Sequence, residues 1–201
     1  MIRFSVRLVS LSVLVLAIAA PAMAYNVVNA ASPGVACIWS PTCSSSVTDY
    51  SSPLMGSGFL QSRINQGQAG SPAAGKWVYR YRVDLRQVAG ITYVPYVDEV
   101  AISNLGAVRQ YDYNYDSVAT DQIFNITSGG IGTKPVTSSF IFFSWSYFVF
   151  GSPVYAGSYP GGGESSYFFG FISDYAPVLR SISVHTDTGW VTVTGYAPSA
   201  P

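Results

Sequence analysis

The segment Trp77–Leu85, with the sequence WVYRYRVDL, decides the fold class of this chain. Its odd-numbered positions are all aromatic or aliphatic, and its even-numbered positions are mostly charged. Alternation with a period of two places one set of side chains on each face of a β-strand. We therefore predict a strand with a buried face formed by Trp77, Tyr79, Tyr81, Val83 and Leu85, and a second face carrying Val78, Arg80, Arg82 and Asp84.

Strand-like segments separated by turn residues continue through the rest of the chain. We expect strands at Ile91–Val94, Val97–Ser103, Val108–Tyr115, Gln122–Ile126, Val136–Phe150, Ser166–Ser173, Leu179–Thr186 and Trp190–Thr194. The clearest hairpin turns at Asp187-Thr188-Gly189. Short strands at regular intervals predict an all-β fold, a single antiparallel β-sandwich of the Ig-like or jelly-roll-like kind.

The most apolar segment after the N-terminus is Phe140–Phe150, FIFFSWSYFVF. It is too short for a membrane-spanning helix, which needs ~20 apolar residues. Its length would suit one strand of an outer-membrane barrel. We favour a central strand, buried on both faces or against a partner, because most other strands lack the lipid-facing alternation of a barrel.

Four segments are expected along the chain. Residues 1–24 resemble a signal peptide, with Arg3 and Arg7 before the apolar run Leu8–Ala20 and a small-residue site that ends at Ala24. We expect cleavage after Ala24, export from the cytoplasm, and no transmembrane segment in the mature chain. The mature chain would contain a loop-rich region at 25–75, a β-sandwich core at 76–197 and a short tail at 198–201. Within the loop-rich region we expect one or two short strands and a helical turn near Leu60–Ile64.

The composition is rich in aromatic residues and poor in charge. The chain has 15 Tyr, 11 Phe and 4 Trp, and only 10% of its residues are charged. Removing Arg3 and Arg7 from the ten basic residues leaves eight, against ten acidic residues. The remaining basic residues are scattered in sequence, which argues against a nucleic-acid partner, because such a partner requires a clustered basic face.

The two cysteines, Cys37 and Cys43, are expected to form a disulfide, because an even pair in an oxidising compartment is usually oxidised. We do not expect a zinc site, because the chain has no second cysteine pair and a single histidine.

Asp112, Asn114 and Asp116 have the D-x-N-x-D spacing that opens many calcium loops, and Ca²⁺ prefers such hard oxygen ligands. The pattern then departs from a calcium loop, since Ser117 replaces the glycine and Ile123 the bidentate glutamate. The alternative is a strand with these three residues facing solvent and Tyr111, Tyr113 and Tyr115 facing inward. Calcium is the one cofactor that the sequence suggests.

Aromatic side chains on a β surface can stack on sugar rings, and aromatic side chains in a sandwich can equally belong to the core. The candidates for a glycan platform are Tyr111, Tyr113, Tyr115, Trp145, Tyr155 and Tyr159, of which we select Tyr113, Trp145 and Tyr159.

Catalytic patterns are weak. His185, the single histidine, could pair with Asp187, but no G-x-S-x-G motif supplies a marked serine. Asp98 and Glu99 are adjacent, so in a regular strand they would point to opposite faces and not act as a carboxylate pair. We therefore expect no catalytic residues and no enzymatic activity.

The last third of the chain resembles a family of exported bacterial proteins. Gly163-Glu-Ser-Ser166 precedes the strand SYFFGFIS, then come Asp174-Tyr-Ala-Pro177, the strand ISVHT and the hairpin TGWVTVTG. These features are similar to the ectodomains of PEP-CTERM/exosortase-type proteins. The resemblance implies a β-sandwich in the envelope, the exopolysaccharide or the biofilm matrix. The Pro-Glu-Pro motif of that family does not occur in this sequence, so neither its anchoring nor any functional residue is carried over.

Together these patterns predict a secreted or cell-envelope β protein without enzymatic activity, with a structural or matrix-associated role. Its expected partners are extracellular polysaccharide or further copies of itself. A carbohydrate-binding module is the first alternative, and a secreted hydrolase is the second.

Overall fold

The computed structural model describes residues 24–31, 47–54, 58–67, 69, 73–90, 94–103, 105, 108–128 and 132–199, with no side chains described for 47–54. The strands within these residues are β1 (Val27–Ala30), β2 (Val47–Leu54), β3 (Gly58–Gln66), β4 (Trp77–Asp84), β5 (Tyr96–Ser103), β6 (Ile123–Ile126), β7 (Val136–Phe142), β8 (Trp145–Tyr155), β9 (Phe168–Ser173), β10 (Pro177–Thr186) and β11 (Gly189–Pro198). No helix occurs among the described residues.

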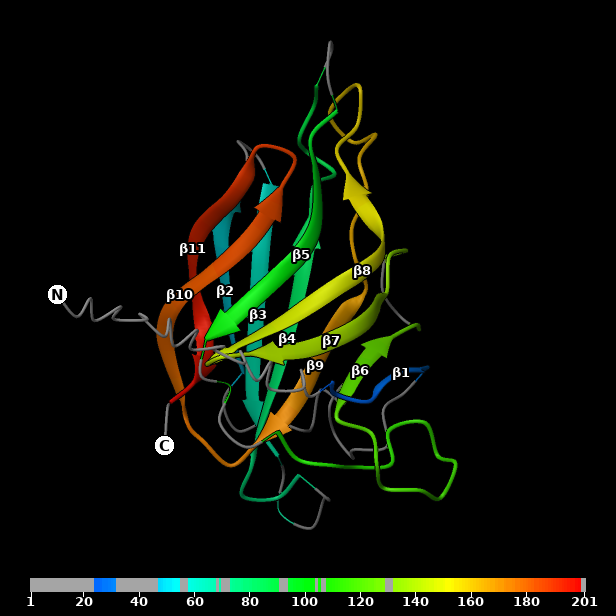
Figure 1. Cartoon of the computed structure of the whole chain (residues 1–201), viewed down its shortest axis with the longest axis vertical. Coiled ribbons are helices and arrows are strands. Elements are labelled where there is room, and N and C mark those ends of the chain that lie inside the picture. Colours follow the sequence, from blue (N-terminus) through cyan, green and yellow to red (C-terminus); the bar gives the residue numbers. More distant parts are fainter. Residues whose placement is uncertain are drawn as a thin grey trace, which may run out of the picture.

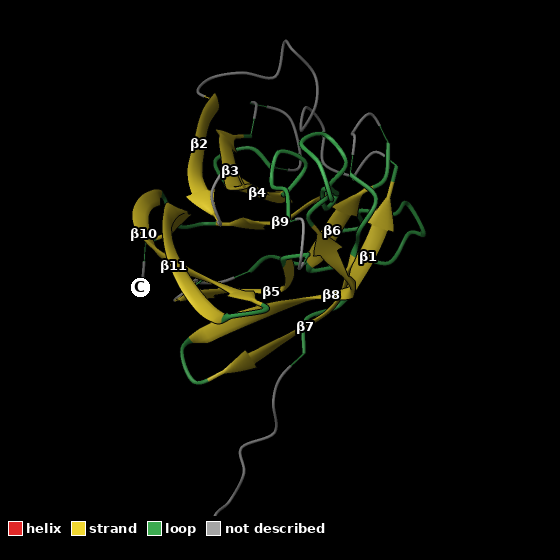
Figure 2. Ribbon diagram, turned by 90° about the horizontal axis from the view of Figure 1, so that it is seen from above, coloured by secondary structure: helices red, strands yellow, loops and turns green. Residues whose placement is uncertain are grey.

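The strands form two sheets that pack face to face (Figure 1). One sheet has the order β1-β6-β9-β4-β3-β2, and the other has the order β11-β10-β5-β8-β7. All neighbours pair antiparallel except β1 and β6, which are parallel. Figure 2 shows the two layers from above, with β5, β8 and β7 in one and β9, β4 and β3 in the other. The expected all-β sandwich is confirmed.

Aromatic rings from both sheets fill the space between the layers. Tyr79, Tyr81, Phe148, Phe169 and Phe171 are fully buried, and Tyr79 stacks on Phe171 with ring centroids 5.3 Å apart. Phe148 of the opposite sheet packs 5.3 Å from Phe169. Because large rings bury the most apolar area, these aromatic residues contribute most of the stabilisation of the core.

The alternation in β4 is confirmed on its inner face, where Tyr79, Tyr81 and Val83 have no exposed surface. The outer face is also partly covered. Val78 is fully buried in a second apolar cluster that includes Tyr113 and Phe124, to which residues 108–128 contribute. The sequence pattern could not show this second layer, because it comes from a segment distant along the chain.

Three local expectations are wrong. Residues 60–64 lie within β3 and not in a helical turn, because β3 pairs with β2 and β4 along its whole length. Residues 108–115 form isolated bridges and bends and not a continuous strand. Residues 136–150 form two strands, β7 and β8, which meet at a turn through Phe143 and Ser144.

Several expectations fall outside the described residues. These are residues 1–23 of the signal peptide expected at 1–24, the disulfide between Cys37 and Cys43, and residues 91–93 of the strand expected at Ile91–Val94. Within the described part of the chain, no helix is long and apolar enough to cross a membrane.

Candidate functional site

A row of aromatic side chains lies on the outer face of the five-stranded sheet. Strand register places Phe140 opposite Tyr147, and these rings stack in parallel with centroids 4.8 Å apart. Trp190 of β11 meets Tyr147 edge to face at 6.0 Å, across the intervening strands β5 and β10. Trp145 is two residues before Tyr147 in β8, so it shares this face. We call Phe140, Phe142, Trp145, Tyr147 and Trp190 the aromatic face.

The aromatic face surrounds a shallow hollow of about 190 Å³. Its floor is formed by Ala101 of β5 and Ser183 of β10, which are paired in the register. Its walls are Trp145, Tyr147 and Trp190. Two small residues side by side in the centre of a sheet leave room between larger neighbours, so rings can project above the sheet without filling the space.

Two carboxylates and a histidine adjoin the Trp190 end of this hollow. Glu99 is opposite His185 in the register, and His185 is opposite Trp190, with their ring centroids 4.9 Å apart. The register shifts between Val97 and Glu99, so the pairing of β5 is irregular around Asp98. This irregularity brings the Asp98 Oδ1 within 2.7 Å of the His185 Nδ1.

The expectation that Asp98 and Glu99 point to opposite faces is therefore wrong. A β-bulge changes the alternation of side chains locally, and both carboxylates lie beside His185. Burial raises the pKa of Glu99, the negative charge of Asp98 raises it further, and His185 acts in the opposite direction. The Glu99 Oε1 is covered from solvent and has no hydrogen-bond partner among the described residues.

The tip of the β7–β8 hairpin extends the aromatic face outward. Phe142 and Phe143 are 55% and 87% exposed, and their rings meet edge to face at 4.5 Å. Phe143 has a φ of 54°, in the left-handed region that bulky side chains avoid. A large apolar residue that is both exposed and strained contributes little to folding.

The three residues selected from the sequence for a glycan platform fall in three different places. Trp145 lies in the wall of the hollow. Tyr113 is fully buried against Phe124, with burial raising its pKa, so it is wrong as a platform residue. Tyr159 is 65% exposed, but its ring covers the backbone at Gly162 in a loop.

The sequence missed Tyr147, Trp190 and the Asp98–His185 pair. A signal was present for the first two, because alternation in β8 and β11 places Tyr147 and Trp190 on the less buried face of each strand. Asp98 and His185 are 87 positions apart in the sequence, so nothing local predicts that they pair. The expected partner of His185, Asp187, instead accepts a hydrogen bond from the Tyr96 N–H. The described residues show no serine hydroxyl bonded to His185.

The candidate calcium residues lie in a loop and not in a strand. The two oxygens of Asp112 accept the backbone N–H groups of Asp116 and Ser117, each at 2.9 Å, and Asp116 accepts that of Val118. Tyr115 is 67% exposed, contrary to the inward orientation of the strand alternative. Ser117 has a φ of 71°, the conformation that glycine usually supplies there. Within the described residues, no three carboxylate, histidine or cysteine side chains are placed to hold a metal ion.

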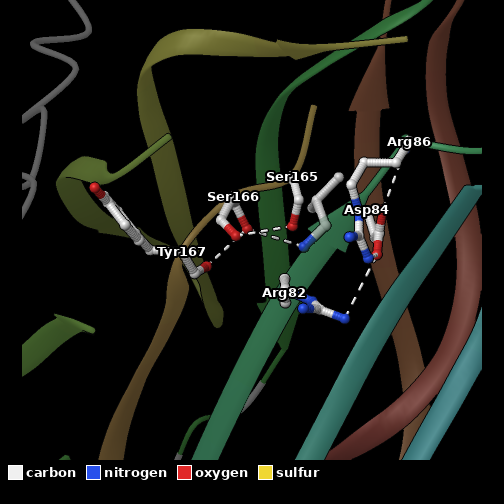
Figure 3. A network of polar contacts seen from close by, with 7 residues as sticks. Arg82, Asp84, Arg86, Ser165, Ser166 and Tyr167 are labelled. Carbon is white, nitrogen blue, oxygen red and sulfur yellow. Dashed lines mark hydrogen bonds and ion pairs between the residues drawn. The ribbon is translucent and has the colours of Figure 1, made fainter. Parts of the chain in front are cut away.

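A second hollow, of about 220 Å³, lies on the outer face of the six-stranded sheet and is lined by Phe59, Gln61, Arg82 and Asp84. Figure 3 shows its polar side, where Arg82 and Arg86 reach the same Asp84 carboxylate. The Arg82 guanidinium also lies over the Phe168 ring, 4.9 Å from its centroid. Since both arginines form ion pairs with Asp84, these charges have a structural role and do not indicate a binding site.

The segment beside this corner is fastened to β4 by the side chain of Ser166 (Figure 3). The Ser166 hydroxyl accepts the Val83 N–H at 3.0 Å and donates to the Tyr167 carbonyl. The Ser165 hydroxyl donates to the Ser166 carbonyl at 3.0 Å. These buried hydroxyls are explained by structure and need no catalytic role.

No protein-family model, no curated protein and no solved structure matches this chain. The geometry of the aromatic face is therefore the observation from which a function can be inferred.

Proposed function

We propose that this chain is an exported glycan-binding β-sandwich, with the aromatic face as its binding surface. The observation that carries the proposal is the hollow with Trp145, Tyr147 and Trp190 around a floor of Ala101 and Ser183. Trp190 is 49% exposed, although a ring of this size would normally be buried in a chain with so large a core. The proposed export depends on the expected signal peptide.

Sugar rings suit this surface for a physical reason. The apolar face of a pyranose stacks on an aromatic ring, while its hydroxyl groups need nearby donors and acceptors. Ser183 on the floor and the Asp98–His185 pair at one end supply such groups. The hollow is shallow and the aromatic face continues to Phe142, so the proposed ligand is a stretch of a polysaccharide chain.

The proposed role is binding without catalysis, in agreement with the expected matrix association. The His185–Asp98 pair contacts no marked nucleophile in the described residues, and the hollow is open. Incubation with polysaccharide should accordingly release no soluble sugar.

The test is co-sedimentation of the mature chain, residues 25–201, with insoluble polysaccharides, including the exopolysaccharide of the producing cell. The Trp190→Ala and Tyr147→Ala variants should weaken binding at least about tenfold, equivalent to about 1.4 kcal/mol. The matched control is Tyr159→Ala, which removes an exposed tyrosine that does not line the hollow and should leave binding unchanged.

Equal loss of binding in Tyr159→Ala would overturn the assignment to this face. Sedimentation of the protein without polysaccharide would point to self-association through the exposed aromatic residues and overturn the proposal. Full retention of binding in Trp190→Ala and Tyr147→Ala would also overturn it.

A further inference from the structure

Charge is divided unevenly between the outer faces of the two sheets. Eight lysine and arginine residues are described: Arg63, Lys76, Arg80, Arg82, Arg86, Arg109, Lys134 and Arg180. Only Arg180 belongs to a strand of the five-stranded sheet. It lies two and four residues before the buried Ile182 and Val184, so it shares their inner face of the sheet. Among the described residues, the strands of the aromatic face therefore contribute no lysine or arginine to it, and His185 is their one basic side chain there.

The acidic residues of the five-stranded sheet lie at one end of the aromatic face. Asp98 and Glu99 both belong to β5 and lie beside His185, next to Trp190. The Glu99 carboxylate is partly desolvated, and its Oε1 has no hydrogen-bond partner among the described residues. A desolvated acceptor without a partner costs folding free energy, and a cation placed near it would recover part of this cost.

We infer that the aromatic face prefers glycans of amino sugars whose nitrogen carries a positive charge, with Glu99 and Asp98 as the charge partners. The inference rests on the proposed function and specifies its ligand class. An ammonium group beside Trp190 would be attracted both by the two carboxylates and by the indole ring. A uronic-acid glycan would instead bring its carboxylates against Asp98 and Glu99, where His185 already pairs with Asp98 and no lysine or arginine of these strands is described, which selects against it.

The experiment measures Kd by calorimetry, at neutral pH and low salt, for equal-length oligomers of glucosamine, N-acetylglucosamine and a uronic acid. The glucosamine oligomer should bind about tenfold more tightly than the N-acetylglucosamine oligomer, as expected for one cation–π contact plus one partly exposed ion pair. The uronic-acid oligomer should bind most weakly. The preference for glucosamine should shrink as salt is added, because salt screens partly exposed charges.

The decisive variant is Glu99→Gln, which keeps the shape of the side chain and removes its charge. It should weaken binding of the glucosamine oligomer to the level of the N-acetylglucosamine oligomer and leave the latter unchanged. The matched control is Asp116→Asn, which removes an exposed carboxylate in the loop at 112–118 and should change nothing. Thermal unfolding of Glu99→Gln checks that the fold is retained.

The outcomes separate the two proposals. Equal binding of the two amino-sugar oligomers, tighter binding of the uronic-acid oligomer, or an unchanged preference in Glu99→Gln would overturn the inference and leave glycan binding intact. Binding of none of the three, or binding that Trp190→Ala does not weaken, would overturn the inference and the proposed function together.

Discussion

Individual side chains show which parts of this molecule serve the fold and which do not. Asp84 holds two arginines, and the Ser166 hydroxyl beside it holds backbone groups, so the ion pairs and hydrogen bonds of these residues serve the fold. Glu99 is the opposite case, since its carboxylate is desolvated, lies near a second acid and keeps an oxygen without a partner. A residue that lowers the stability of the fold, and gains no compensating interaction within it, is a candidate for function.

The Asp84 corner predicts how stability depends on pH. Burial alone would raise the pKa of Asp84, but hydrogen bonds from Arg86 and the charges of Arg86 and Arg82 outweigh it and hold the pKa below its ordinary value. Since the pKa is lower in the folded chain than in the unfolded chain, the stabilisation is present above about pH 4, the ordinary value for aspartate. It is lost as the pH falls from there through the folded-state pKa.

Asp84→Asn should therefore lower the free energy of unfolding at neutral pH and flatten its decline in acid, so that the curves of variant and parent converge at low pH. Urea unfolding across a pH series measures this, with Asp116→Asn as the exposed control. Parallel curves for Asp84→Asn and the parent would show that the ion pairs of Arg82 and Arg86 contribute nothing.

At the scale of elements, the β7–β8 hairpin carries the most unusual local structure. The sequence Phe140–Phe150 is apolar enough to be a single buried strand, yet it bends at Phe143 and Ser144. This turn places Phe140 and Tyr147 on the same outer face and leaves Phe142 and Phe143 exposed at the tip. Phe140, Trp145 and Tyr147 thereby lie on the surface that we propose for ligand binding.

Phe143→Gly should stabilise the protein, because glycine adopts a positive φ without steric cost and the phenylalanine ring is mostly exposed. The expected gain in the free energy of unfolding is about 1 kcal/mol, as relief of the left-handed conformation suggests. Ser144→Gly in the same turn is the control and should give no gain, since Ser144 has no positive φ. A loss of stability in Phe143→Gly would show that the contact with Phe142 outweighs the backbone strain.

In the whole molecule, the core and the proposed binding surface lie on opposite faces of the same sheet. Phe148 points inward from β8 to Phe169 and Phe171 of the other sheet, while its neighbour Tyr147 points outward to Trp190. Alternation along β8 therefore places side chains that stabilise the fold on one face and side chains of the proposed binding surface on the other. Stability and binding should respond to different substitutions.

Phe148→Ala should cost about 3–5 kcal/mol of unfolding free energy, because it opens a cavity between the sheets. At a temperature where it remains folded, its glycan affinity should stay within about twofold of the parent, since binding differences below about 0.5 kcal/mol are expected away from the site. Trp190→Ala should show the reverse, with nearly parental stability and weak binding. Loss of both properties in both variants would contradict this division.

The sequence by itself determined the all-β class, the inner face of β4, the segments that form β5, β6, β9, β10 and β11, and the last hairpin. These follow from alternation and turn chemistry, which act between residues close in sequence. Three outcomes depended on tertiary structure: the burial of Tyr113, the split of residues 136–150 into two strands, and the meeting of Asp98, His185 and Trp190. His185 and Trp190 are partners in the last hairpin, whereas strand order and a shift in register brought Asp98 to them, and neither of these leaves a local trace in the chain.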